Sequence, residues 1–188
     1  MKQVIEERMQ EHLQVLQKVM RSALPEQLEK TAQLIDAALC RGNKILFCGN
    51  GGSAADSQHL AAEFVGRFQT ERRGLPAVAL TVDTSILTAV ANDYGYDAVF
   101  ARQVQALGQP GDVLVGLSTS GNSANVLRAI AEAKAKGMTC IGMTAAGGGK
   151  MAACCDICLA VPAAEVTARA QEMHILMGHI LCELVDHE

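Results

Sequence analysis

The segment CGNGGSAADSQHLAAEF, residues 48–64, contains a histidine and a glutamate whose side chains can bind a metal or move a proton. His59 and Glu63 are four residues apart, so on a helix both side chains point toward the same small volume. An imidazole and a carboxylate at this spacing form either a metal-binding or acid/base pair, or an ordinary solvated ion pair. The pair alone favours neither interpretation, so the surrounding residues have to decide.

A second set of polar residues lies near the C-terminus, in RAQEMHILMGHILCELVD. Gln171, His174 and His179 interrupt a segment that is otherwise rich in apolar residues, where a histidine without a partner is costly. His174 and His179 are five residues apart and point in different directions on a helix. We therefore expect at most one of them to join His59 and Glu63, and the periodicity does not choose between them.

Two loops have the residue types of an anion-binding site. In GNGGS, three glycines allow close approach of the backbone to a ligand, and a serine is placed to cap the next helix: Gly49, Gly51, Gly52 and Ser53. STSGNS supplies four hydroxyl groups ahead of a helix that begins near Ala124: Ser118, Thr119, Ser120 and Ser123. Neither loop has the nucleotide-binding pattern G-x-x-x-x-G-K-[ST] or G-x-G-x-x-G, so ATP and NAD are disfavoured. Either loop alone is often a plain turn, but together they favour a phosphate or sugar ligand.

Five short apolar runs predict the strands that position these loops. The runs are KILFC, AVALT, DVLVGLS, MTCIGMT and DICLAV, and helical segments or glycine-containing turns separate them. Strands joined by such crossovers form a parallel sheet covered on both faces, which predicts a doubly wound, five-stranded α/β fold of the flavodoxin-like type. Ligands bind beyond the carboxyl ends of the strands in such folds, where both loops lie.

The predicted helices outside these crossovers carry more apolar surface than one sheet can cover. An apolar stripe marks a long N-terminal helix: Ile5, Met9, Leu13, Leu16 and Met20. A second helix starts at Pro25 and stops at Gly42, and the last helix, roughly 165–186, is apolar over more than one stripe. We expect one domain over residues 1–188, with residues 1–42 as a helical extension of an α/β core at 43–188, and subunit contacts that cover the excess.

The overall composition excludes several classes of protein. The chain has 188 residues and is 49% hydrophobic, with 16 basic against 20 acidic residues, so the basic surface of a nucleic-acid-binding protein is missing. No apolar run is long enough to span a bilayer and the N-terminus is charged, so we expect a cytoplasmic protein without a membrane partner. Seven cysteines argue against a disulfide framework, and Cys155 and Cys158 in CCDIC fit a buried strand better than a metal site.

Taken together, the segments resemble the sedoheptulose 7-phosphate (phosphoheptose) isomerases of the sugar isomerase (SIS) superfamily. The resemblance covers nearly the whole chain through CGNGGSAADSQHLAAEFVGRF, LTAVANDYGYDAVFARQV, GDVLVGLSTSGNSANVLRAI, GGKMA and QEMHILMGHILCELV. It implies four zinc ligands: His59, Glu63, Gln171 and His179. It also implies substrate contacts from Asn50, Gly51, Gly52, Glu63, Asn92, Asp93, Ser118, Thr119, Ser120, Ser123 and Gln171. Glu63 and His179 would be catalytic, which leaves His174 as a polar group satisfied at a helix or subunit interface.

The reaction that this resemblance implies moves a carbonyl from C2 to C1 of a seven-carbon sugar phosphate, the first step toward the heptose of lipopolysaccharide. Such a transfer needs two titratable groups and an enediol-like intermediate. We assign Glu63 to the carbon-bound proton and His179 to the oxygens, with Zn²⁺ polarising the carbonyl, although the two residues can exchange roles. Gln171 and His179 are eight residues apart, a helical rise of about 12 Å, so either the helix bends near Gly178 or different subunits supply the ligands.

Two other functions fit parts of the sequence. A non-catalytic SIS tetramer that binds the bacterial replication initiator resembles this chain through TERRGLPAVAL, LTAVAND and QEMH, but a scaffold has no need of both Glu63 and His179. A sugar-phosphate-sensing SIS module is normally joined to a further domain, for which this chain has no room. The isomerases resembling this chain are homotetramers with active sites at subunit boundaries, so we expect a homotetramer with His179 near a boundary.

Overall fold

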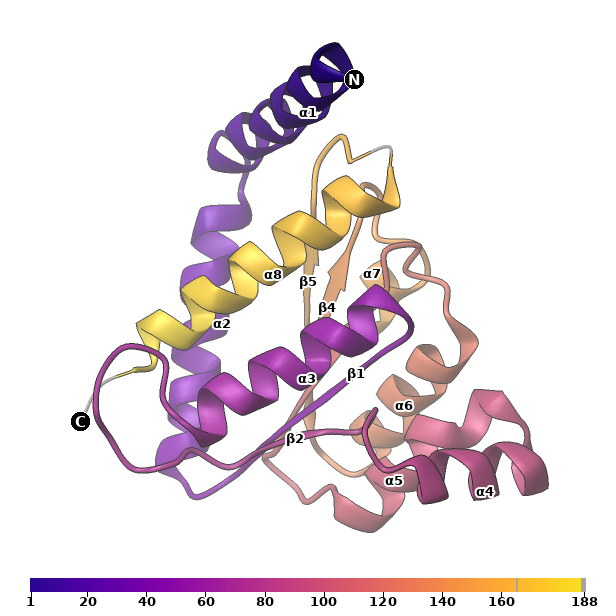
Figure 1. The fold of residues 1–188 in the computed structure, drawn as a ribbon. Coiled ribbons are helices and arrows are strands. Elements are labelled where there is room, and N and C mark those ends of the chain that lie inside the picture. The colour runs from indigo at the N-terminus through magenta and orange to yellow at the C-terminus, as the bar shows by residue number, and fades with distance from the viewer. Residues whose placement is uncertain (165, 187–188) are drawn as a thin grey trace.

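The computed structural model describes residues 1–164 and 166–186, and they form a helix–sheet–helix sandwich (Figure 1). Five parallel strands make the sheet: β1 (Ile45–Gly49), β2 (Ala77–Ala79), β3 (Val113–Leu117), β4 (Thr139–Thr144) and β5 (Ile157–Ala160). Their order in the sheet is β2-β1-β3-β4-β5. The predicted doubly wound fold is therefore confirmed, and the order reverses between β1 and β3.

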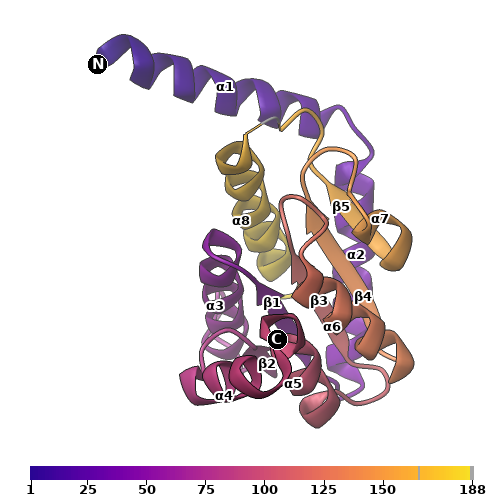
Figure 2. The same cartoon turned by 90° about the vertical axis from the view of Figure 1, so that its right-hand side faces the viewer.

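Alternation along the strands divides the core into two parts. In β1, Ile45 and Phe47 face one layer of helices, whereas Leu46 and Cys48 face the other. The first layer contains α2 (Leu24–Cys40), α3 (Gly52–Val65) and α8 (Thr167–Leu184). The second contains α5 (Val99–Leu107) and α6 (Ala124–Ala135), with α4 (Thr84–Tyr94), η1 (Tyr96–Ala98) and α7 (Met151–Cys154) beside them (Figure 2). Because both sheet faces are covered, the strands consist mostly of apolar residues.

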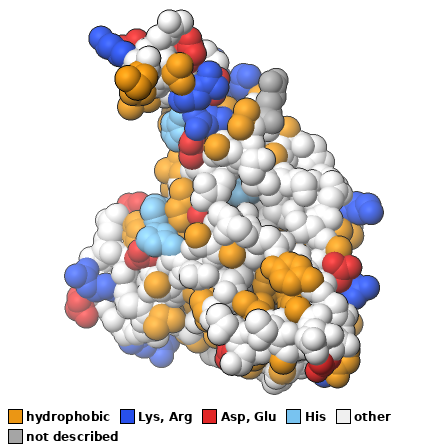
Figure 3. All heavy atoms as spheres, turned by 45° about the vertical axis from the view of Figure 1, so that its right-hand side comes forward, with side chains coloured by type: hydrophobic (Ala, Val, Ile, Leu, Met, Phe, Trp, Pro, Cys, Tyr) orange, Lys and Arg blue, Asp and Glu red, His pale blue; other side chains and the backbone are white. Residues whose placement is uncertain are grey.

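The first helix, α1 (Lys2–Met20), projects away from the sandwich (Figures 1 and 3). Val15 and Val19 pack against the rest of the chain. In contrast, Met9 and Met20 are each 68% exposed, and Ile5 and Leu13 are exposed as well. Most of the apolar stripe read from the sequence is thus left uncovered by this chain.

Several helix ends follow their sequence signals, but one does not. Pro25 lies in the first turn of α2, and Gly42 follows that helix with a φ of +83°, as expected for glycine after a helix. The expectation that Ser53 caps α3 is wrong, because α3 begins at Gly52 and its N-cap is Gly51, whose φ is +57°. The last helix ends close to its predicted bounds, and Glu165 lies outside the described residues.

Two further properties bear on the protein's class. None of the described helices combines the length and the apolar character that crossing a bilayer requires. The seven cysteines are all free thiols.

Candidate active site

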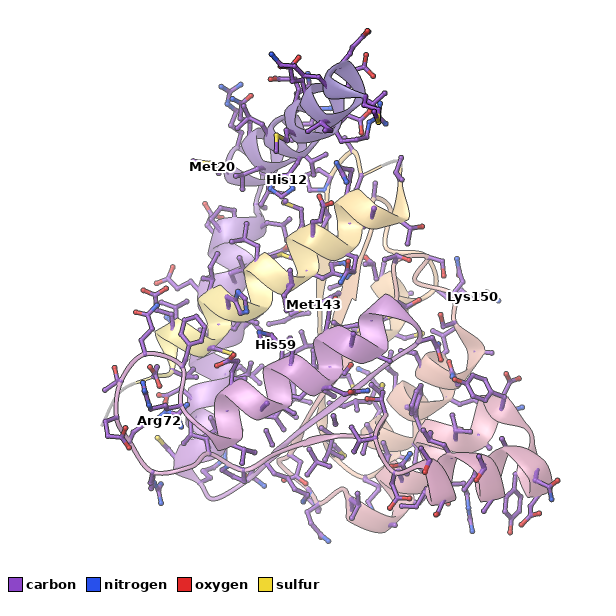
Figure 4. The ribbon with its side chains drawn as sticks, in the orientation of Figure 1. His12, Met20, His59, Arg72, Met143 and Lys150 are labelled. Carbon is purple, nitrogen blue, oxygen red and sulfur yellow. The ribbon has the colours of Figure 1, made fainter. Side chains whose placement is uncertain are left out.

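The candidate site lies where α3 and α8 pack side by side and run in the same direction (Figures 1 and 4). The two helices come close because Gly178 has no side chain: a methyl group there would lie 2.5 Å from Leu60 Cδ2. Gly178 therefore permits close packing, and α8 continues through it without a break from Thr167 to Leu184. Side chains of the two helices can meet along this line.

Three of the residues proposed for chemistry meet on the exposed side of this line. His59 Nε2 lies 2.8 Å from His179 Nε2 and 3.4 Å from Glu63 Oε1. The two imidazole rings are arranged edge to face with centroids 5.1 Å apart, and Phe68 packs against His179. The side chain of His59, labelled in Figure 4, is 46% exposed and that of Glu63 is 24% exposed, so a ligand can reach them from solvent.

Gln171 does not join these three residues but lies beside Asp56 near the start of α3. Its Nε2 donates a 2.7 Å hydrogen bond to Asp56 Oδ1, and its side chain lies against Gly52. The eight-residue separation from His179 is thus retained along an unbroken helix, and no bend brings Gln171 to His59 within this chain.

Asp56 is a candidate site residue that sequence reasoning missed. It is only 4% exposed, and its Oδ2 has no hydrogen-bond partner among the described residues. Burial raises the pKa of its carboxyl, while the Gln171 hydrogen bond and the nearby His59 and His179 imidazoles oppose that shift. The signal was its position one helical turn before His59, on the same face of α3.

His174 is buried, but among the described residues it lacks the well-formed hydrogen bond expected of a satisfied polar group. It is 0% exposed, and neither ring nitrogen makes a well-formed hydrogen bond to a described residue. Burial lowers the pKa of its imidazole, although the backbone of Thr144 partly opposes the shift. The histidine that α8 contributes to the site with His59 is His179.

The hydroxyl-rich loop lies at the carboxyl end of β3. Ser118 Oγ is 2.8 Å from Ser123 Oγ and 3.4 Å from Ser120 Oγ, so three of its hydroxyls form one cluster. Thr119 accepts a hydrogen bond from the backbone of Ala145 through its carbonyl oxygen. Ser123 is the N-cap of α6, so free backbone N–H groups of that helix adjoin the cluster.

Asn50 connects this loop to the glycine-rich loop after β1. Its side-chain amide forms two hydrogen bonds with Asn125, of 2.8 and 2.9 Å, and Tyr96 Oη donates to Asn50 Oδ1 over 3.1 Å. Neither Asn125 nor Tyr96 had been singled out in the sequence, because nothing in their local pattern reveals a contact made across the fold.

Asn92 and Asp93 remain apart from the other predicted site residues. Both are exposed near the end of α4, where Asn92 Nδ2 donates to Asp93 Oδ1 over 2.8 Å. In the described part of the chain, apart from this bond between them, neither side chain forms a hydrogen bond with a predicted site residue.

The side chains at this site have the donor atoms that the implied zinc ion needs, but they are not arranged around an ion. Two imidazoles and a carboxylate are ligand types that zinc prefers. However, in residues 1–164 and 166–186, no three His, Cys, Asp or Glu side chains are already arranged to hold an ion. The Nε2 atoms of His59 and His179 share a hydrogen bond, and Gln171 donates a hydrogen bond to Asp56. The donor chemistry fits zinc, while binding would require these two hydrogen bonds to break.

Comparison with known proteins identifies the family of this chain. Residues 9–145 match the model of the SIS domain. The phosphoheptose isomerase of Rhodospirillum rubrum is 60% identical over 159 residues, which are 85% of this chain and 84% of that protein. That of Aliarcobacter butzleri is 55% identical over 177 residues, 94% of this chain and 93% of the relative. This chain belongs to the phosphoheptose isomerase family.

A solved structure extends the likeness to the whole fold. The phosphoheptose isomerase of Neisseria gonorrhoeae is 46% identical and superimposes with a TM-score of 0.92, over 98% of each chain. The resemblance read from the sequence is therefore confirmed. Membership of the phosphoheptose isomerase family makes this chain an aldose–ketose isomerase, and the interpretation as a replication-initiator-binding scaffold is not favoured.

Proposed function

We propose that the chain converts sedoheptulose 7-phosphate to D-glycero-D-manno-heptose 7-phosphate at the line where α3 meets α8. The observation that carries this site assignment is the convergence of His59, Glu63 and His179, with Nε2–Nε2 and Nε2–Oε1 separations of 2.8 and 3.4 Å. The Glu63 carboxylate and the His179 imidazole both contact His59, so both can exchange protons with neighbouring atoms of one small substrate.

Proton transfer accounts for the whole reaction. Glu63 removes a proton from C1 of the open-chain ketose, the C1–C2 enediol forms, and Glu63 returns a proton to C2. His179 gives a proton to the C2 oxygen and removes one from the C1 oxygen, so that no net proton is gained or lost. The reverse assignment, with His179 acting on carbon, uses the same geometry.

The terminal phosphate belongs in the loop after β3. The clustered hydroxyls of Ser118, Ser120 and Ser123 supply donors, and the N-terminus of α6 contributes free backbone N–H groups. We assign Thr119 and the backbone of Gly51 and Gly52 to the same ligand. Asn92 and Asp93 are assigned to the substrate as well. Because they lie apart from the other site residues of their own chain, they would complete the site of a neighbouring subunit.

Zinc is part of the proposal. His59, Glu63, Gln171 and His179 would hold it, and when bound it supplies a Lewis acid that polarises the sugar carbonyl. The test is metal content: the purified protein should carry zinc in proportion to its chains, measured by inductively coupled plasma mass spectrometry, and His59→Ala should lose it. Zinc retained by His59→Ala at the wild-type ratio would contradict this ligand set.

A homotetramer in the cytoplasm completes the proposal. Support comes from the exposed apolar stripe of α1, in which Met9 is 68% exposed, and from Leu184 of α8, which is 50% exposed. Closed symmetric assembly is the usual way for identical patches to be covered. Sedimentation at micromolar concentration should show four chains, and a fully active monomer would contradict the arrangement.

The function itself is tested by incubating the protein with sedoheptulose 7-phosphate and following the aldose by NMR. Glu63→Gln and His179→Gln should each abolish conversion and remain folded, because they remove proton transfer with little change of volume. Glu26→Gln, an exposed acid in the first turn of α2, is the matched control and should convert normally. Near-normal turnover by Glu63→Gln or His179→Gln would refute the assigned roles.

A further inference from the structure

A small hydrogen-bond network joins three segments around the candidate sugar site. Asn50 comes from the loop after β1, Asn125 from the first turn of α6 and Tyr96 from η1. Asn125 is 3% exposed, whereas Tyr96 is 58% exposed. The network thus begins in the interior and ends at the surface beside a loop assigned to the substrate.

One backbone group fixes the orientation of the buried amide. The N–H of Val126, which can only donate, points at Asn125 Oδ1 over 3.0 Å. The other atom of the Asn125 amide must therefore be the NH₂ group. That group lies 2.8 Å from Asn50, so the Asn50 atom facing it must be the acceptor Oδ1.

The fixed polarity extends from Asn50 to Tyr96 at the surface. Because Asn50 Oδ1 can only accept, the Tyr96 hydroxyl must direct its hydrogen toward Asn50, over 3.1 Å. Asn50 Oδ1 then accepts two hydrogen bonds, and its lone pairs are both in use. What remains for a ligand is the second N–H of Asn50, which is a donor, and the lone pairs of Tyr96 Oη, which are acceptors.

We propose that Asn125 is a positioning residue that fixes this polarity, so that Asn50 presents a donor and Tyr96 an acceptor to the sugar phosphate. An oxygen of the substrate would accept from Asn50, and a sugar hydroxyl would donate to Tyr96. The assignment rests on the proposed function, because it places a polyhydroxylated phosphate ester at this loop. It adds two residues to the site, one of which touches the ligand and one of which acts through Asn50.

Asn125→Asp is the decisive variant because it keeps the shape and removes the donor. An ionised aspartate would face Asn50 Oδ1 with a second acceptor, and this repulsion, together with burial, raises the pKa of the new carboxyl. We expect a KM about tenfold above wild type near pH 8, the loss expected for a buried hydrogen bond, with a smaller change in kcat. On acidification the carboxyl gains a proton that it can donate to Asn50, so the ratio of the two KM values should fall.

Three further variants separate positioning from a general structural role. Asn125→Leu has a similar shape and does not titrate, so its KM ratio to wild type should stay raised at every pH. Tyr96→Phe removes only the exposed hydroxyl and should raise KM severalfold without unfolding the protein. Tyr94→Phe is its matched control: Tyr94 is 59% exposed and its ring lies under Arg102, a contact that phenylalanine keeps. Its KM should not change.

The outcomes are distinguishable from failure of the proposed function. A wild-type protein that does not convert sedoheptulose 7-phosphate refutes that function, and the melting temperature then tests the network without substrate: the deficit of Asn125→Asp should shrink on acidification, and that of Asn125→Leu should not. With an active wild type, a KM ratio for Asn125→Asp that is independent of pH, or an unchanged KM in Tyr96→Phe, overturns the proposal. If the Asn125 variants do not fold, Tyr96→Phe and Tyr94→Phe decide it alone.

Discussion

Two buried aspartates stand at opposite ends of the α3–α8 pair, and their surroundings differ in one respect. Asp186 follows the end of α8, and both of its carboxylate oxygens accept hydrogen bonds. Asp56 lies in the second turn of α3, and one of its oxygens has no partner among the described residues. Asp56 is 4% exposed and Asp186 is 7% exposed, so the difference between them lies in hydrogen bonding rather than in burial.

Asp186 closes a structural clamp. It accepts from the backbone N–H groups of Gln69 and Thr70 and from Arg72 Nε, and Arg72 in turn donates to the carbonyl oxygens of Glu63 and Phe64 (Figure 4). Burial alone would raise the pKa of Asp186, but these hydrogen bonds and the Arg72 charge together lower it to about 2. The clamp ties the end of α3 to the end of α8.

The pKa of Asp56 is shifted in the opposite direction from that of Asp186. Burial dominates, the pKa of its carboxyl is raised, and a single hydrogen bond from Gln171 holds it. Perturbed ionisable groups with unsatisfied atoms are concentrated at functional sites, whereas fully satisfied ones serve structure. The comparison assigns Asp186 to stability and Asp56 to the site near His59.

The largest expected effect is the loss of the clamp. Asp186→Ala leaves the Arg72 charge buried without its partner, which should lower the free energy of unfolding by about 3–5 kcal/mol. Glu71→Ala is the matched control, because Glu71 forms an exposed pair with Arg67 and should cost no more than about 1 kcal/mol. Urea unfolding of both variants measures the difference. Equal losses would show that Asp186 is not the stronger contributor.

Acid should remove the same stabilisation in the wild type. The folded pKa of Asp186, about 2, lies below the unfolded value. The contribution is therefore complete above about pH 4, the unfolded value for an aspartate, and is lost as the pH falls toward the folded value. Between these limits the advantage of wild type over Asp186→Asn should decrease in urea unfolding. An advantage that is constant across this window would contradict a depressed pKa.

A smaller effect is expected at the other aspartate when its one donor is removed. Gln171→Ala leaves the Asp56 carboxylate without a side-chain hydrogen bond, which should cost about 1–3 kcal/mol at neutral pH. Gln105→Ala, an exposed glutamine on α5, is the control and should change little. Thermal and urea unfolding report the cost, and indistinguishable results for the two variants would remove Gln171 as the partner that matters to Asp56.

The smallest stability change, with the opposite sign, is expected for Asp56→Asn. A raised pKa means that the ionised carboxyl disfavours the folded state at neutral pH, and this penalty disappears as the pH falls below the unfolded value. Asparagine keeps the acceptor for Gln171 and carries no charge, so the melting temperature should stay the same or rise at pH 7, and the gain should shrink in acid. A marked fall at pH 7 would place Asp56 with Asp186 as a structural residue.

Much of the fold and part of the site could be read from the sequence. The strands were recognisable because buried parallel strands are continuous apolar runs, and His59 and Glu63 could be paired because helical spacing is local. Asp56 could have been added by the same rule. The contacts of Asp186 with Gln69, Thr70 and Arg72 could not, since they join residues more than a hundred positions apart.

Local patterns therefore determined the succession of strands and helices along the chain, the buried faces of the helices and the positions of the loops at the carboxyl ends of the strands. The packing of α3 against α8 decided which histidine meets His59, because the close approach at Gly178 sets the register of the two helices. It also placed Gln171 beside Asp56. The polarity of Asn50 depends on Asn125, Val126 and Tyr96, and a hydrogen bond between distant residues has no signature in either local sequence. Periodicity reports which face a side chain occupies, whereas the partner across that face exists only once the chain has folded.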